Sequence, residues 1–164
     1  MERWFTHRLD SRTKGDRHHK VKTFWRILAE YFLIHGNRLK IRYWPGDLDL
    51  PEHLAYSAYG IRTLQKYVIS NRVTEDDTME IIVGPINNEV IDLVLGETTQ
   101  PFSSICPWFD LSILDQQDNI LFYSHDHGAG TLMKLTEDSL QYLAVKGIDF
   151  DYLIEQPEIV THEV

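Results

Sequence analysis

The fold is decided by residues 21–35, which read VKTFWRILAEYFLIH. Seven side chains in this stretch recur with the 3.6-residue period that lines one face of a helix: Val21, Phe24, Trp25, Leu28, Tyr31, Phe32 and His35. Gly36-Asn37 follows directly and supplies the left-handed conformation that ends many helices. The sequence therefore predicts a core-forming helix over residues 21–35.

The segments after this helix alternate between strand and helix patterns. Residues 38–44 predict a half-exposed strand whose outward basic side chains suit an edge or a partner-facing surface. A second helix is predicted over about 53–70 and an acidic loop over 71–78. Two hairpins are predicted next, one of strands 79–83 and 90–95 joined by 84–89, and one of strands 109–113 and 120–123. A short strand over 132–135 follows. The last two predicted elements are a helix from the N-cap Thr136 to Gly147 and a strand over 149–155.

This order predicts an α+β fold, with a mainly antiparallel sheet of about five to six strands and three helices packed on it. The chain has 164 residues, of which 43% are hydrophobic, so we expect one domain over residues 21–155. Residues 1–20 are predicted to form a basic N-terminal arm, which Trp4 and Phe5 can pin to the domain, and residues 156–164 a loose tail. The longest dense apolar stretch is interrupted by charges and falls short of the roughly 20 residues that span a bilayer, so we expect a cytoplasmic protein without membrane contact.

Charge is strongly segregated along the chain. Residues 1–42 contain 11 Lys/Arg and 4 Asp/Glu, a net charge of +7, and the other 122 residues contain 5 bases and 21 acids, a net charge of −16. Such a division indicates an electrostatic partner, either inside the molecule or outside it. The basic arm can neutralise phosphates, but the acidic remainder repels nucleic acid and no nucleic-acid-binding motif is present.

The best candidate for a catalytic or metal site is the segment Ser124–Gly130, which reads SHDHGAG. In an extended strand His125 and His127 point to the same side, which lets two imidazoles bind one metal ion. The nearby glycines would let a ligand approach the backbone. No third ligand stands at a telling spacing, and a polar turn with solvated histidines is the simpler interpretation.

The other reactive residues favour structural roles. Cys106 is the single cysteine, so no intramolecular disulfide can form, and its apolar neighbours indicate a buried, inert thiol in a reducing compartment. The chain has no nucleophile elbow, P-loop or dinucleotide fingerprint, and we expect no cofactor. Carboxylate clusters in its loops are typical of a solvated surface.

We therefore expect a binding protein rather than an enzyme. In size, acidity and lack of a catalytic set the chain resembles the small immunity proteins that bacteria keep in the cytoplasm to neutralise basic toxins, although no motif carries this resemblance. The hypothesis is an inhibitor of a basic protein partner. Its predicted contact residues are acids in loops (Glu75, Asp76, Asp77, Asp115 and Asp118), acids of the predicted last strand (Asp149 and Asp151) and two aromatic anchors (Trp108 and Tyr152). Alternatives are a metal-dependent hydrolase that uses His125 and His127, and a nucleic-acid adaptor that uses residues 3–22.

Overall fold

The computed structural model describes residues 1–7, 16–51, 59–74, 78–96 and 105–157. Within them the chain forms one antiparallel sheet of eight strands and four α-helices. The strands are β1 (Arg3–His7), β2 (Arg38–Tyr43), β3 (Ser70–Val73), β4 (Glu80–Pro85), β5 (Asp110–Leu114), β6 (Ile120–His125), β7 (Gly130–Leu135) and β8 (Leu153–Gln156). The helices are α1 (Asp16–His35), α2 (Ile61–Leu64), α3 (Asn88–Leu95) and α4 (Glu137–Val145), with 3₁₀ turns η1 (Pro45–Asp49), η2 (Gln65–Tyr67), η3 (Asp126–Gly128) and η4 (Phe150–Tyr152). The α+β class is confirmed, whereas five to six strands and three helices are too few.

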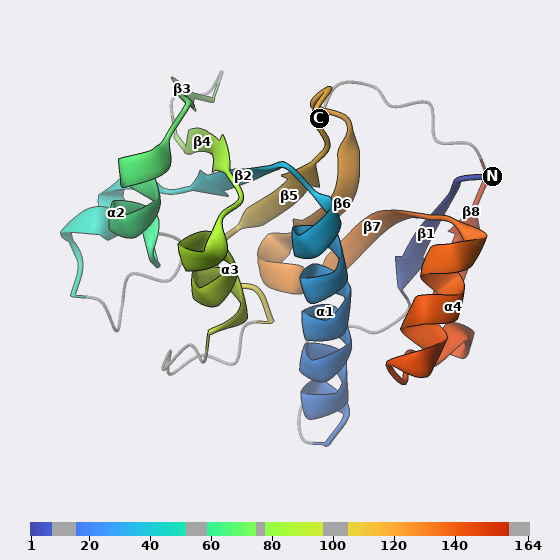
Figure 1. Cartoon of the computed structure of the whole chain (residues 1–164). Coiled ribbons are helices and arrows are strands. Elements are labelled where there is room, and N and C mark those ends of the chain that lie inside the picture. The colour runs from blue at the N-terminus through green and yellow to red at the C-terminus, as the bar shows by residue number, and fades with distance from the viewer. Residues whose placement is uncertain (8–15, 52–58, 75–77, 97–104, 158–164) are drawn as a thin grey trace.

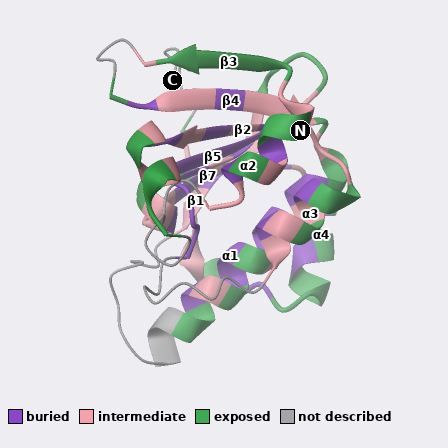
Figure 2. Cartoon of the chain, turned by 90° about the vertical axis from the view of Figure 1, so that its left-hand side faces the viewer, coloured by how far each residue is buried: buried purple, intermediate pink, exposed green. Residues whose placement is uncertain are grey.

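The sheet has the strand order β3-β4-β2-β5-β6-β7-β1-β8, and every neighbouring pair is antiparallel. Figure 1 shows the arrangement of the elements, and Figure 2 shows the strands in one layer with α1, α3 and α4 in a second layer on one side of it. The opposite side of the sheet, which we call the open face, has no helix of the described residues packed on it. No helix in the described part of the chain is long and apolar enough to cross a membrane.

Helix α1 is the core-forming element, as predicted, but it begins five residues earlier. Trp25 and Phe32 are buried against β6, where the Trp25 indole N–H donates a 2.9 Å hydrogen bond to Ser124 Oγ and the Phe32 ring stacks on Phe122. At the end of the helix, a Cβ on Gly36 would lie 2.3 Å from a side-chain carbon of Ile113. Glycine is therefore needed for the chain to pass so close to the sheet.

The predicted N-terminal arm is wrong at both of its ends. Arg3–His7 forms strand β1, which lies between β7 and β8, and Asp16–Lys20 forms the first part of α1. Phe5 is buried and so pins the terminus to the core, as expected. Strand β1 has five residues and its partners lie 126–152 positions away, so no local signal is long enough to predict it. The tail beyond residue 157 lies outside the described residues.

The predicted hairpin of strands 79–83 and 90–95 is half wrong. Its first strand is β4, but residues 88–95 form helix α3 instead of a second strand. The Asn87 side chain caps this helix by accepting a 2.9 Å hydrogen bond from the Val90 N–H, and Val90 and Val94 are buried one turn apart. The run of β-branched and leucine residues favoured a strand, whereas the N-cap decides for a helix.

We expect Asn87→Ala to lower the free energy of unfolding by about 1 kcal/mol, because the cap then leaves an N–H of the first turn without its acceptor. Asn87→Ser keeps a short side-chain acceptor and should recover most of the loss. Chemical denaturation monitored by circular dichroism measures both variants. Equal stability of Asn87→Ala and the parent protein would show that the cap contributes nothing.

Further predictions differ from the structure. The last strand expected over 149–155 is the turn η4 followed by β8, which begins at Leu153 and includes Gln156 of the predicted tail. The helix expected over 53–70 is the short α2 with η2, and residues 52–58 lie outside the described residues. Ser70–Val73 is the exposed strand β3 rather than part of an acidic loop. Strand β2 is confirmed but lies between β4 and β5, so it is not an edge strand. Its basic side chains are accessible because the open face is uncovered, which alternation alone does not distinguish from an edge.

Candidate functional site

Asp115 and Asp118 lie in the β5–β6 turn. Both are predicted to contact a partner, but in the structure their carboxylates form hydrogen bonds within the molecule. The Asp115 carboxylate accepts hydrogen bonds from the backbone N–H groups of Gln117 and Asn119 and from the Asn119 amide. Asp118 has a φ of +65° and accepts two hydrogen bonds, at 2.6 and 2.7 Å, from Arg38. These contacts account for both acids without a partner.

Trp108 is not the exposed anchor we expected. Its side chain is fully buried, and its indole N–H donates a 2.7 Å hydrogen bond to the carbonyl of Tyr59. Tyr152 is half-buried, with its ring edge-on to Phe24 at 5.8 Å and the Lys20 ammonium 4.6 Å from its centroid. Both aromatics therefore pack within the molecule. Glu75, Asp76 and Asp77 lie outside the described residues.

His125 and His127 lie in different surroundings. Strand β6 ends at His125, whose exposed ring stacks on Tyr123 and lies over Gly130. Asp126 and His127 both have positive φ, so the backbone is not extended between the two histidines. The His127 ring instead lies beside Trp44 and Phe109, with Nδ1 3.2 Å from the Pro107 carbonyl oxygen. In the described parts of the chain no group of three or more His, Cys, Asp or Glu residues could hold a metal ion.

The glycines after His127 serve packing. Gly128 has a φ of +92°, and a Cβ there would lie 2.7 Å from the Cβ of Ile105. The η3 turn is bound to the same segment by hydrogen bonds from the Cys106 N–H to the His127 carbonyl and from the His127 N–H to the Phe109 carbonyl. Cys106 is a buried free thiol, as expected, and burial raises its pKa to about 12. The thiol is therefore protonated and inert at neutral pH.

Two predicted acids, Asp149 and Asp151, lie on a distinct exposed surface formed by α4 and η4. A groove of about 460 Å³ runs along α4 and is lined by Glu137, Leu140, Gln141, Ala144 and Phe150. Beside it three apolar side chains are exposed, namely Val145 (87% exposed), Tyr142 (39%) and Phe150 (37%). The acids at its margin are Glu137, Asp138, Asp149 and Asp151. We call the groove and its surrounding residues the acidic α4 surface; these are Glu137, Asp138, Leu140, Gln141, Tyr142, Ala144, Val145, Lys146, Asp149, Phe150 and Asp151.

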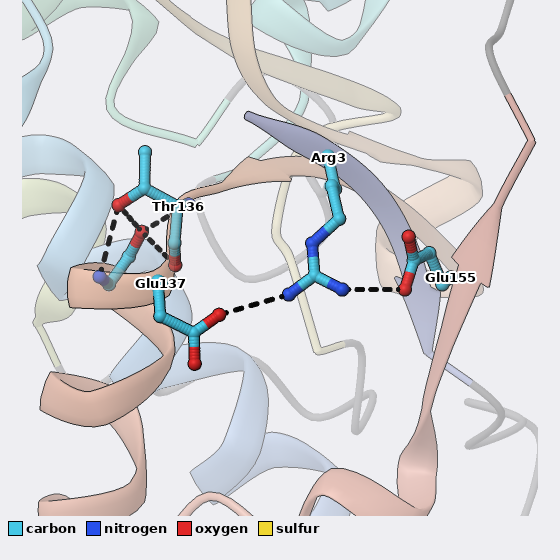
Figure 3. Close-up of polar contacts among 5 residues, drawn as sticks. Arg3, Thr136, Glu137 and Glu155 are labelled. Carbon is cyan, nitrogen blue, oxygen red and sulfur yellow. Dashed lines mark hydrogen bonds and ion pairs between the residues drawn. The ribbon is translucent and has the colours of Figure 1, made fainter. Parts of the chain in front are cut away.

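Local contacts fix this surface in place. The Thr136 side chain caps α4 by accepting from the Ser139 N–H, and the Ser139 hydroxyl accepts from the Thr136 N–H, so the predicted N-cap is confirmed. Arg3 of β1 binds Glu137 of α4 at 3.2 Å and Glu155 of β8 at 2.9 Å (Figure 3). Arg3 therefore ties the start of α4 to the edge of the sheet.

A second candidate site, which the sequence did not reveal, is a hollow of about 300 Å³ on the open face. It is lined by Lys40, Arg42, Ile81, Asp110, Ser112 and Tyr123, and we call it the open-face hollow. The register explains how they meet, because Arg42 pairs with both Ile81 and Asp110, and Ser112 pairs with both Lys40 and Tyr123. Alternation in β2 and β5 was visible in the sequence, but the pairing of these two strands was not.

The ionisable groups of the open-face hollow have shifted pKa values. Asp110 is 6% exposed, and burial raises its pKa even though the Arg42 ion pair, the Asp126 N–H and the Tyr123 hydroxyl favour its charge. Burial, with the nearby charge of Asp110, raises the pKa of Tyr123 to about 12. Burial, Arg72 and Arg42 lower the pKa of Lys40. Such a concentration of perturbed groups is typical of functional sites, although structural ion pairs also produce it.

No protein-family model matches the chain, and no curated protein or solved structure is significantly similar to it. The function is therefore inferred from the chain's own residues.

Proposed function

We propose that this chain is a small acidic binding protein that inhibits a basic protein partner, in the manner of an immunity protein, and that it binds this partner through the acidic α4 surface. The observation that carries the proposal is the combination of exposed apolar side chains with a margin of acids on one helix and the turn that follows it. Protein interfaces typically have an apolar centre and a polar rim.

The distribution of ion pairs supports an acidic rather than a basic contact surface. Arg3, Arg38 and Arg42, from the basic first quarter of the sequence, are all paired with acids that follow it. The segregated charge is thus partly neutralised inside the molecule. By contrast, Asp138, Asp149 and Asp151 form no ion pair within the described residues, and the chain has a net charge of −9. A positively charged partner would form ion pairs with these three carboxylates.

The two kinds of residue have different roles in this proposal. Exposed acids at a rim steer a basic partner towards the surface and act mainly on the association rate, which falls as salt rises. Tyr142, Val145 and Phe150 would be covered by the partner and act on dissociation, as central aromatic and aliphatic anchors do. The groove beside α4 offers room for one side chain of the partner.

The test is capture of partners from the extract of the cells that produce the protein, at about 0.1 M and about 0.5 M salt, since screening grows between these concentrations. The site variant is Asp138→Asn/Asp149→Asn/Asp151→Asn. Its matched control, Glu30→Gln/Asp49→Asn/Asp92→Asn, changes the net charge equally at positions outside the acidic α4 surface. We expect a basic protein to be captured by the parent and the control, and its capture by the site variant to fall about tenfold or more, the effect of roughly 1.4 kcal/mol.

The captured protein is then purified and its binding kinetics are measured against Tyr142→Ala and Val145→Ala, which should raise the dissociation rate more than they lower the association rate. Three results would contradict the proposal. They are equal capture by the site and control variants, recovery of RNA or DNA instead of a basic protein, and a partner whose binding does not weaken at high salt.

A further inference from the structure

The open-face hollow contains a buried charge pair whose hydrogen bonding is incomplete. Asp110 Oδ1 and Arg42 Nε are both buried and have no hydrogen-bond partner among the described residues, although the two side chains are ion-paired through their other atoms. A buried polar atom without a partner costs about 1–3 kcal/mol, so such atoms are rare in native proteins. One unpartnered atom is an acceptor and the other a donor, and both belong to residues that line the same hollow.

The charges around the hollow favour an anion. Lys40 and Arg42 line it, and Arg72 is close enough to contribute, after burial, to lowering the pKa of Lys40. Among the described residues the only acid lining it is Asp110, in a chain whose net charge is −9. A local excess of positive charge inside an acidic protein is therefore concentrated at this hollow, where a bound anion would relieve the repulsion among the three cations.

The hydroxyl groups of the hollow add polar recognition. Tyr123 is protonated across the physiological range, because its pKa is raised to about 12, and the Ser112 hydroxyl lies directly across the strand pair from it. The hollow has only six lining residues in the described parts of the chain, so its ligand would be small.

We propose that the open-face hollow binds a small organic anion that carries a hydrogen-bond donor next to its anionic group, as a 2-hydroxy acid does. The anionic group binds to Lys40 and Arg42, and the donor group donates a hydrogen bond to Asp110. Asp110 Oδ1 and Arg42 Nε are buried, so in this proposal the Arg42 side chain turns outward when the ligand binds and exchanges its ion pair with Asp110 for one with the anionic group. This site is on the opposite side of the sheet from α4 and is independent of the partner proposed above.

The probe is glycolate, with acetate as the anion that lacks the hydroxyl donor. Backbone amide shifts in ¹H–¹⁵N NMR report the titration of the ¹⁵N-labelled chain. We expect saturable shifts in β2, β5 and β6 with glycolate, and binding of acetate that is weaker by about tenfold, the effect of roughly 1.4 kcal/mol. Lys40→Gln should weaken glycolate binding by a similar factor, whereas the control Lys66→Gln, an exposed lysine of η2 paired with Glu89, should leave it unchanged.

Thermal melting first establishes that both lysine variants are folded. Shifts that do not saturate by about 10 mM glycolate, well above the millimolar affinity of a weak specific site, would overturn the proposal. Equal weakening by Lys40→Gln and Lys66→Gln, or equal binding of acetate and glycolate, would show an adventitious ion only and would also overturn it. Asp138→Asn/Asp149→Asn/Asp151→Asn should bind glycolate like the parent, so failure of the partner proposal does not affect this result.

Discussion

Trp25→Ala is expected to lower the free energy of unfolding by about 3–5 kcal/mol, the usual cost of removing a large buried aromatic side chain. Trp25 is 3% exposed in the centre of α1, and its ring lies edge-on to Phe122 of β6. The substitution also leaves the fully buried Ser124 hydroxyl without its indole donor. Chemical denaturation gives the change directly, and a loss this large can prevent soluble expression.

Two further variants separate the contributions of packing and hydrogen bonding. Trp25→Phe keeps an aromatic ring but removes the indole N–H, so we expect an intermediate loss that includes about 1 kcal/mol for the lost hydrogen bond to the buried Ser124 hydroxyl. Ile34→Ala changes an exposed residue of the same helix, and its effect should lie within about 0.5 kcal/mol of the parent. If Trp25→Ala melts like Ile34→Ala, then α1 is peripheral and the core lies elsewhere.

The elements that could be predicted from the sequence are those whose signals are local. Helix α1 carries a seven-position stripe, α4 begins with a capping residue, and the β5–β6 hairpin alternates on both sides of a polar turn. Each of these patterns is complete within about 20 residues. The apolar run of α3 fits either a strand or a helix, and the cap by the single Asn87 side chain decides for the helix.

The elements that were missed are determined by distant contacts. Strand β1 pairs with β7 and β8 from the far end of the chain, so no local pattern indicates where it lies. Strand β3 is mostly polar and exposed along its length, and its pairing with β4 makes it a strand. In both cases the backbone hydrogen bonds of the sheet outweigh the propensity of a short segment.

The same reasoning explains the candidate sites. Asp149 and Asp151 are predicted as acids of a strand, but the chain there forms the turn η4, which leaves both acids exposed on the acidic α4 surface. The sequence could not exclude Trp108 as an exposed contact residue. An aromatic residue in a loop-like segment does not show whether other parts of the chain cover that segment. The open-face hollow was beyond prediction, since the contact of Arg42 with Asp110 requires the pairing of β2 with β5 across 68 positions of sequence.

Arg42→Met is expected to lower the free energy of unfolding at pH 7 by about 3–5 kcal/mol, because it removes one partner of an ion pair whose other partner is buried. Asp110 would then keep its charge in the core without the guanidinium that offsets part of its desolvation. The reverse variant, Asp110→Asn, should cost much less, since the Arg42 side chain is 34% exposed and can be solvated. The expected asymmetry between the two single variants is measured by denaturation at neutral pH.

The pH dependence of Arg42→Met provides the decisive control. The folded-state pKa of Asp110 is already raised above its ordinary value by burial, and loss of Arg42 raises it further. Folding then favours the protonated carboxyl, so stability is highest below the unfolded pKa of about 3.9 and falls as pH rises through the folded pKa. The deficit of Arg42→Met should therefore shrink towards pH 4.

The double variant Arg42→Met/Asp110→Asn keeps an acceptor for the Asp126 N–H but has no charge to bury, so it should recover most of the stability and lose this pH dependence. A deficit in Arg42→Met that is equal at both pH values would show that Arg42 stabilises the fold through packing on Phe109, 5.0 Å from its guanidinium carbon, and not through Asp110.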